Sequence, residues 1–104
     1  NVNVKSFMGL FAGCSSLISI PEGLFKNNVN VINFVTTFGY SGLRNIPEGL
    51  FKNNVNVINF VETFRGCTGL TGIPEDIIEL GKKVKERGGD TRSMFRLLYI
   101  ILKL

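Results

Sequence analysis

The chain has 104 residues, 44% hydrophobic and 19% charged, which is typical of one small folded domain and argues against a disordered segment. It contains no His and only two Cys, which excludes the most common general base and zinc ligand and a disulfide-rich scaffold. The net charge of +4 is uneven, because residues 1–81 carry five basic and six acidic side chains and residues 82–104 carry seven and two.

An internal repeat dominates the sequence. Residues 20–35 and 46–61 have the same sequence, IPEGLFKNNVNVINFV, and related stretches extend the repeat in both directions. The three Asn residues that open the units, Asn1, Asn28 and Asn54, are 27 and then 26 positions apart. Periods of this length are typical of solenoids built from stacked units. We therefore divide the chain into three repeats, 1–27, 28–53 and 54–80, followed by residues 81–104.

Each unit carries signals for two helical segments and one strand. The V-x-x-F-V-x-x-F spacing of 31–38 and 57–64, anticipated by 4–11, predicts one face of a helix. Asn30 is a candidate N-cap, and a Gly follows the last Phe at positions 13, 39 and 66, where helices often end. A Pro at positions 21, 47 and 74 predicts a second, shorter helical turn. Between these helical segments, 17–20, 43–46 and 70–73 are expected to be short strands in a parallel sheet.

Apolar residues at equivalent positions of the units predict a stacked core. A single unit cannot bury its own apolar face, so its neighbours must cover it. The expected columns are Leu17/Leu43/Leu70, Ile20/Ile46/Ile73, Phe7/Phe34/Phe60, Phe11/Phe38/Phe64 and Leu24/Leu50/Ile77. Recurrent Asn residues (Asn3/Asn30/Asn56 and Asn27/Asn53) are interpreted as caps and turns, with a stacked amide ladder as the alternative.

The motif F-x-G-C-S-S-L-x-x-I-P-x-G-L-F-x-N of residues 11–27 resembles the BspA-like leucine-rich repeat proteins of bacterial surfaces. The V-x-x-F-x-x-x-F spacing that follows is also similar, and the resemblance covers about residues 1–80. It implies a surface-displayed or secreted array used in adhesion or host contact. No signal peptide is visible in this chain, so we expect a part of a longer protein.

The C-terminal residues are expected to close the stack. Residues 75–87 read as one helix with an i,i+4 pair of Glu79 and Lys83, and residues 91–104 align on 4–17 as a degenerate repeat. The expected fold class is therefore α/β: a leucine-rich-repeat solenoid with short parallel strands on one face, short helices on the other and a C-terminal capping unit. The first unit has no such cover, so its apolar face needs an upstream unit or another copy of the chain.

The units differ from one another mainly in the predicted strands and in the loops before them. Because the sheet face of a solenoid is a common binding surface, we expect ligand-facing residues there: Ile18, Tyr40, Arg44, Asn45 and Thr71. The alternative is that exposed positions simply vary. The sequence therefore favours non-catalytic binding of a protein or glycan ligand as the function.

Catalytic and metal sites are not expected. Cys14 and Cys67 occupy the same column two units apart, roughly 10 Å by strand spacing, which is too far for a disulfide. We expect both to be buried free thiols. One Glu per unit follows the Pro (Glu22, Glu48, Glu75), where a negative charge favours a helix dipole. We find no nucleotide-binding or nucleophile motif and expect no cofactor and no enzyme.

Two alternative functions remain open. The uncovered first repeat allows a self-associating structural module. The basic C-terminal residues allow binding to nucleic acid or anionic membrane, although charges on a terminal helix are more often simply solvated; these residues are Lys82, Lys83, Lys85, Arg87, Arg92 and Arg96.

Overall fold

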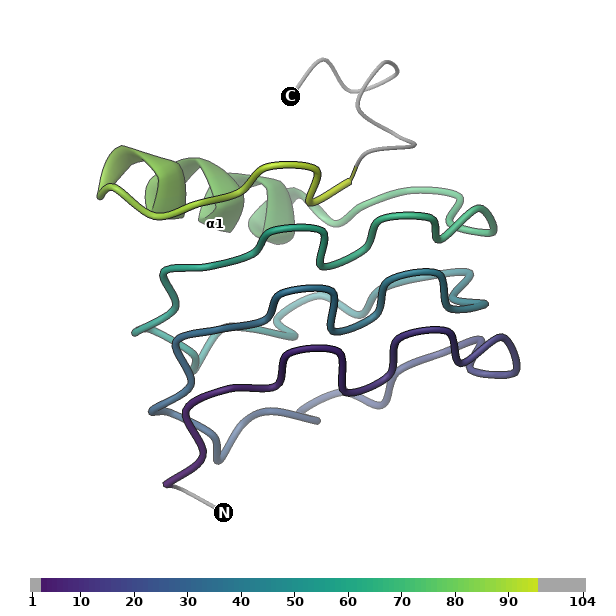
Figure 1. Ribbon diagram of the computed structural model, residues 1–104, viewed down its shortest axis with the longest axis horizontal. Coiled ribbons are helices and arrows are strands. Elements are labelled where there is room, and N and C mark those ends of the chain that lie inside the picture. The colour runs from purple at the N-terminus through teal and green to yellow at the C-terminus, as the bar shows by residue number, and fades with distance from the viewer. Residues whose placement is uncertain (1–2, 96–104) are drawn as a thin grey trace.

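The structure, a computed structural model, describes residues 3–95 and contains one helix, α1 (Glu75–Glu86), within that range. The remaining described residues form turns and irregular chain, joined by three isolated parallel bridges instead of a sheet. The expectation of an α/β leucine-rich-repeat solenoid with parallel strands, a row of helices and a capping unit is therefore wrong. Consecutive turns of irregular chain lie above one another instead (Figure 1).

The helices expected at 31–38 and 57–64 are turns, and their own residues explain why. Thr36 and Glu62, in the middle of these segments, have left-handed φ angles of 53° and 56°, which end any right-handed helix. Asn33 and Asn59 accept hydrogen bonds through their side chains from the backbone N–H two residues later, at 2.8 and 3.0 Å. Such local side-chain bonds compete with helical ones, and the apolar spacing does not reveal them.

Four segments of the chain lie side by side and form the frame of the molecule. We call them rung 1 (6–13), rung 2 (33–40), rung 3 (59–66) and rung 4 (90–95). Alternate backbone N–H groups of one rung donate to carbonyls of the next, with four bonds between rungs 1 and 2, four between rungs 2 and 3 and three between rungs 3 and 4. These bonds measure 2.7 to 3.0 Å, and their N–H groups all point toward the C-terminal end of the stack.

The first residue of every rung forms the same hydrogen bond within its own rung. The side-chain oxygens of Ser6, Asn33, Asn59 and Asp90 accept a hydrogen bond from the N–H two residues later, at 2.8 to 3.2 Å. The same four residues form the three parallel bridges. A short polar acceptor therefore starts each rung with an Asx-type turn.

Phenylalanine rings fill the interior in columns that run along the stack. Phe11, Phe38, Phe64 and Phe95 stack with centroid distances of 5.3 to 5.4 Å. The expected columns Phe7/Phe34/Phe60 and Phe11/Phe38/Phe64 are thereby confirmed. A third column, Phe25 and Phe51, is nearly fully buried and lies between the other two, yet the sequence analysis did not assign it to the core.

Side-chain amides and hydroxyls join one repeat to the one before it. Asn53, Asn54 and Asn56 donate to backbone carbonyls of residues 25–29 at 2.9 to 3.2 Å. Thr37 and Thr63 donate to the carbonyls of Phe7 and Phe34, both at 2.9 Å. Asn53 and Asn56 lie in turns, as the expectation of caps and turns allowed, and they also cross-link the layers.

Helix α1 replaces the turn that follows Pro in the first two copies. Pro74 precedes it, Glu75 and Asp76 lie in its first turn, and Lys83 and Lys85 lie in its last turn, as the helix dipole favours. Ile77 and Val84 are buried on its inner face. The expectation of one helix over 75–87 is confirmed to within its last residue. The ion pair, however, joins Lys82 to Glu79 at 3.5 Å, not Lys83 to Glu79.

The register of the last rung differs from the expected alignment. Asp90 pairs with Asn59, and Phe95 continues the column of Phe64. Ser6 is therefore matched by Asp90, whereas the sequence alignment matched it to Ser93, three positions later. The aligned residues Leu98 and Leu104 lie outside the described residues, and the repeat boundaries at 27, 53 and 80 remain predictions.

Candidate binding surface

The five residues expected to face a ligand are all exposed. Four of them lie in the loops that follow the rungs, which we call the connecting loops (14–20, 41–46 and 67–73), and Tyr40 ends rung 2. Ile18 and Tyr40 are 51% and 54% exposed, which is high for residues of this size in a chain with a phenylalanine core. Arg44, Asn45 and Thr71 are exposed as well.

Three of the five residues form one row across the connecting loops. The N–H of Arg44 donates to the carbonyl of Ile18 at 3.0 Å, and the N–H of Thr71 donates to the carbonyl of Arg44 at 3.3 Å. The hydroxyl of Thr71 also lies 3.4 Å from that carbonyl. Asn45 follows Arg44 in the chain. Ile18, Arg44 and Thr71 are therefore neighbours, although no strand pairs 17–20 with 43–46, as had been expected.

Glycine permits this close approach of the loops. A Cβ on Gly42 would lie 2.1 Å from the carbonyl oxygen of Ser15, and a Cβ on Gly69 would lie 3.1 Å from that of Leu43. No side chain fits at Gly42 without moving the neighbouring backbone. The exposed row thus has a defined spacing, because backbone atoms and not side chains set the distance between its members.

Tyr40 belongs to a second cluster at the end of rungs 2 and 3. Its ring lies against Gly66, where a Cβ would come within 2.3 Å of the ring. Arg65 lies beside the ring and forms an ion pair with Glu62. The pKa of Arg65 is raised above its usual value, chiefly by the hydrogen bond to Glu62 and further by Tyr40. An aromatic ring and a fixed pair of charges are therefore presented together.

The conformation of Tyr40 is unusual for a tyrosine. Its φ is 57°, in the left-handed region, and the equivalent residues Gly13 and Gly66 have φ angles of 73° and 76°. The sequence analysis assigned the helix-ending role to Gly39, but Gly39 does not have a positive φ; Tyr40 takes the position instead. The strain of about 1–2 kcal/mol that a side chain brings to this region is accepted here for a ring that stays exposed.

Sequence reasoning missed Arg65 as part of the surface. The signal was present in the comparison of the copies: Arg65 stands where the other two have Ala12 and Gly39. A charge that appears in only one copy, next to the singular Tyr40, is a copy-specific feature.

The two cysteines are in different environments, which corrects the expectation that both are buried. Both are free thiols; Cys67 is buried and Cys14 is exposed. Cys67 donates to the carbonyl of Phe38 at 3.0 Å and lies 3.4 Å from the hydroxyl of Ser41. Burial raises the pKa of the Cys67 thiol, while its hydrogen bond with Ser41 acts in the opposite direction. Ser41 is the residue of the middle copy at the position that Cys14 and Cys67 occupy in the other two copies.

The basic residues of the C-terminal part do not form one free patch. Arg87 donates through its guanidinium to the carbonyl of Val57 and so fastens the end of α1 to the chain just before rung 3. Arg92 pairs with Asp90 at 2.7 Å, and this pair lowers the pKa of Asp90. Lys82 pairs with Glu79, whereas Lys83 and Lys85 are exposed on α1. Arg96 lies outside the described residues.

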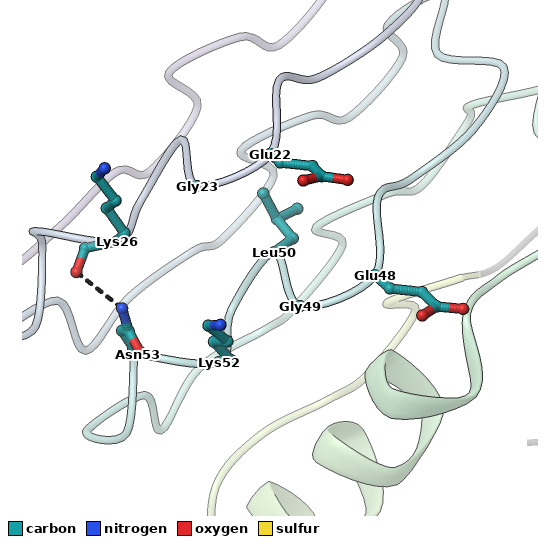
Figure 2. A pocket seen from close by; sticks show the side chains of 8 residues that line it. All are labelled: Glu22, Gly23, Lys26, Glu48, Gly49, Leu50, Lys52 and Asn53. Carbon is teal, nitrogen blue, oxygen red and sulfur yellow. Dashed lines mark hydrogen bonds between the residues drawn. The ribbon is translucent and has the colours of Figure 1, made fainter.

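A shallow pocket lies between the two copies of the Pro-Glu-Gly turn (Figure 2). Its volume is about 370 Å³, and it is lined by repeated pairs, Glu22 with Glu48 and Lys26 with Lys52, together with Leu50 and Asn53. Glu22 and Glu48 had been expected at helix N-termini, but both lie on turns. Opposite charges line the wall in equal number, so the pocket has no preference for a ligand of one sign.

The described residues contain no group of three or more His, Cys, Asp or Glu side chains that could hold a metal ion. Within the same range, α1 is neither long nor apolar enough to cross a membrane, and no other helix is present. No family model, curated protein or solved structure matches this chain. Its surface must therefore be interpreted from its own chemistry.

Proposed function

We propose that the chain is a non-catalytic binding module and that its ligand contacts the row of Ile18, Arg44 and Thr71 in the connecting loops. The observation that supports the proposal is that variable residues from three repeats lie next to one another and are exposed, while the core residues of the same repeats scarcely differ. Asn45 and the neighbouring Tyr40 extend the surface.

The chemistry of these residues favours a protein ligand over a glycan. Tyr and Arg contribute most of the energy in many protein–protein interfaces, and an exposed Ile offers apolar area beside them. The backbone of the row is spaced by close loop contacts at Gly42, so little conformational entropy is lost on binding.

The test measures binding of the purified chain to two immobilised panels, one of extracellular-matrix proteins and one of glycans. For each ligand bound by the wild type, the affinities of Arg44→Ala and of the matched control Lys83→Ala are compared. Both positions are exposed and basic, and only Arg44 lies in the row. We expect Arg44→Ala to weaken binding at least about fivefold, as for an interface arginine, and Lys83→Ala to have no effect.

Tyr40→Ala provides a second reading, with circular dichroism to verify that the fold is kept, since the ring packs on Gly66. If both the Arg44 and the Tyr40 variant bound a verified ligand with the affinity of the wild type, this surface would be excluded. Binding to the glycan panel alone, lost with Arg44→Ala, would keep the surface and replace the protein ligand by a carbohydrate.

A further inference from the structure

Rung 1 has one side that faces away from rung 2, which we call its lower face. This face is exposed at positions where the equivalent residues of the other rungs are buried. Leu10 is 48% exposed, whereas the equivalent residues Thr37, Thr63 and Met94 are 0%, 0% and 4% exposed. The core columns repeat the contrast, because Val4, Phe7, Phe11 and Leu17 are only partly buried and their counterparts in the second and third copies are buried. In the interior of the stack, each of these positions is covered by another rung.

The backbone of rung 1 presents hydrogen-bond acceptors on the same face. The carbonyls of Asn33, Val35, Thr37 and Gly39 in rung 2 accept from rung 1. The equivalent carbonyls in rung 1 are those of Ser6, Met8, Leu10 and Ala12, and no backbone N–H of residues 3–95 donates to them. The lower face of rung 1 therefore combines an apolar strip with a row of carbonyls in the spacing that rung-to-rung bonding uses.

Rung 4 carries the complementary groups at the other end of the stack. In rung 3, the N–H groups of Phe60, Glu62 and Phe64 donate upward to rung 4. The equivalent N–H groups of rung 4 are those of Thr91, Ser93 and Phe95, and no carbonyl of residues 3–95 accepts from them. Donors at one end and acceptors at the other follow from the single direction of all the rung-to-rung bonds.

We propose that the lower face of rung 1 binds rung 4 of a second copy of this chain. The contact reproduces, between molecules, the packing that joins successive rungs three times within one molecule: apolar side chains at alternate positions are covered and N–H groups meet carbonyls in parallel register. A second copy is the occupant because rung 4 of this chain carries N–H groups in the spacing that the carbonyls of rung 1 require.

The two ends differ, so the contact is heterologous. A heterologous contact leaves one free rung 1 and one free rung 4 on every assembly, and association does not stop at a dimer unless the ring closes. A self-complementary contact of rung 1 with rung 1 would set carbonyls against carbonyls and is disfavoured. The expected product is therefore a series of oligomers whose mean length grows with concentration.

The experiment is sedimentation velocity on the purified full chain, from about 1 μM to about 1 mM, the range in which weak specific contacts dissociate. The wild type is compared with Leu10→Lys, which places a charge on the proposed face, and with Ile58→Lys. Ile58 is 52% exposed, close to the value for Leu10, and lies outside all four rungs. We expect the wild type and Ile58→Lys to grow with concentration and Leu10→Lys to associate at least about tenfold more weakly.

A mixing experiment tests the direction of the contact. Leu10→Lys keeps an intact rung 4, so the fluorescently labelled variant should bind the free rung 1 of wild-type assemblies and shorten them. Monomers at all concentrations, a wild type that stops at a closed dimer, or a Leu10→Lys variant that grows like Ile58→Lys would each overturn the proposal. Thermal melts of both variants verify that each is folded before its mass is interpreted.

Discussion

Residues 20–35 and 46–61 have the same sequence and the same local conformation, yet their surroundings are unequal. Gly23 and Gly49 have φ angles of 71° and 72°, and Phe25 and Phe51 are equally buried. Leu24, however, is only partly buried, whereas Leu50 is almost completely buried. The second copy is covered by the turn before it and by α1 after it, and the first copy lacks one of these neighbours. Local conformation therefore follows from the residues, and burial follows from the neighbours.

The third copy changes conformation itself. Pro21-Glu22-Gly23 and Pro47-Glu48-Gly49 form turns, whereas Pro74-Glu75-Asp76 begins helix α1. The positive φ of the Gly ends a helix before it can start, and Asp76 has no such preference. Asp76 also accepts a hydrogen bond from the N–H of Gly49 at 2.8 Å, so the helix is fastened to the turn beneath it. The exchange of Gly for Asp is the first of several differences between the third copy and the other two.

The largest expected difference in stability is between variants of Leu24 and Leu50, which occupy equivalent positions of the two identical segments. Leu50→Ala should lower the free energy of unfolding by about 2–5 kcal/mol, because it leaves a cavity in a closed interior. Leu24→Ala should lower it by clearly less, since Leu24 already contacts solvent. Urea denaturation of both variants measures the difference. Phe25→Ala and Phe51→Ala serve as controls of equal burial and should be equally costly; equal losses for the two leucines would contradict the comparison.

Asn28 and Asn54 occupy equivalent positions of the two copies, and replacing them should also lower the stability by unequal amounts. Asn54 is fully buried and donates to the carbonyls of Phe25 and Asn28 at 3.1 and 2.9 Å. Asn54→Ala leaves these carbonyls without that donor and should cost about 1–3 kcal/mol. Asn28 is partly exposed, so water can replace its side chain and Asn28→Ala should cost less. Thermal unfolding of the two variants measures the effect, and a larger loss at Asn28 would be evidence against it.

A smaller effect tests the turn against the helix. Gly49→Ala should cost about 1–2 kcal/mol, because the φ of 72° disfavours a side chain and the new Cβ would meet only Lys52 at an ordinary 3.6 Å. Asp76→Gly should cost about 1 kcal/mol through helix propensity and further through the bond to Gly49. Chemical denaturation measures both costs, and circular dichroism should show helix loss in the Asp76 variant alone. Unchanged stability of Gly49→Ala would show that the turn is not constrained.

The smallest effect concerns the ion pair at the start of rung 4. The hydrogen bond and charge of Arg92 hold the pKa of Asp90 below its usual value. The contribution of Asp90 to stability is therefore complete above its unfolded pKa of about 3.9 and is lost as the pH falls through the lower folded pKa. Arg92→Ala should reduce the melting temperature slightly at neutral pH and converge with the wild type in acid. Melting curves at pH 7 and below pH 3 measure this difference, and a constant gap between the two proteins would refute it.

Much of the core could be predicted from the chain, for a physical reason. Apolar residues that recur at a fixed period must find one another when copies stack, whatever the path of the backbone between them. Phe11, Phe38 and Phe64 were therefore placed correctly without knowledge of their conformation. The exposure of Ile18, Arg44 and Thr71 was anticipated on similar grounds, since copies vary most readily where they do not pack.

The path of the backbone was not predictable in the same way, because helices and turns share the same apolar spacing. Thr36 and Tyr40 adopt left-handed φ angles that their residue types disfavour. The hydrogen bonds between rungs offset the strain of these angles. The buried column of Phe25 and Phe51 was missed as well, because its burial depends on contacts with the rings of another column, such as Phe34. The row of Ile18, Arg44 and Thr71 likewise depends on loop contacts that no pattern in the residues reveals.

The sequence by itself thus determined the repeat, its stacked phenylalanine columns, the helix that follows Pro74 and the variable positions that remain exposed. These features depend on composition and on the period at which residues recur, and both are properties of the sequence alone. Only the tertiary structure decided that the rungs are irregular, that Asp90 and not Ser93 begins the fourth, and that the two ends of the stack carry complementary groups. These features depend on hydrogen bonds between residues 25 to 30 positions apart, and their geometry is defined only when the layers are in contact.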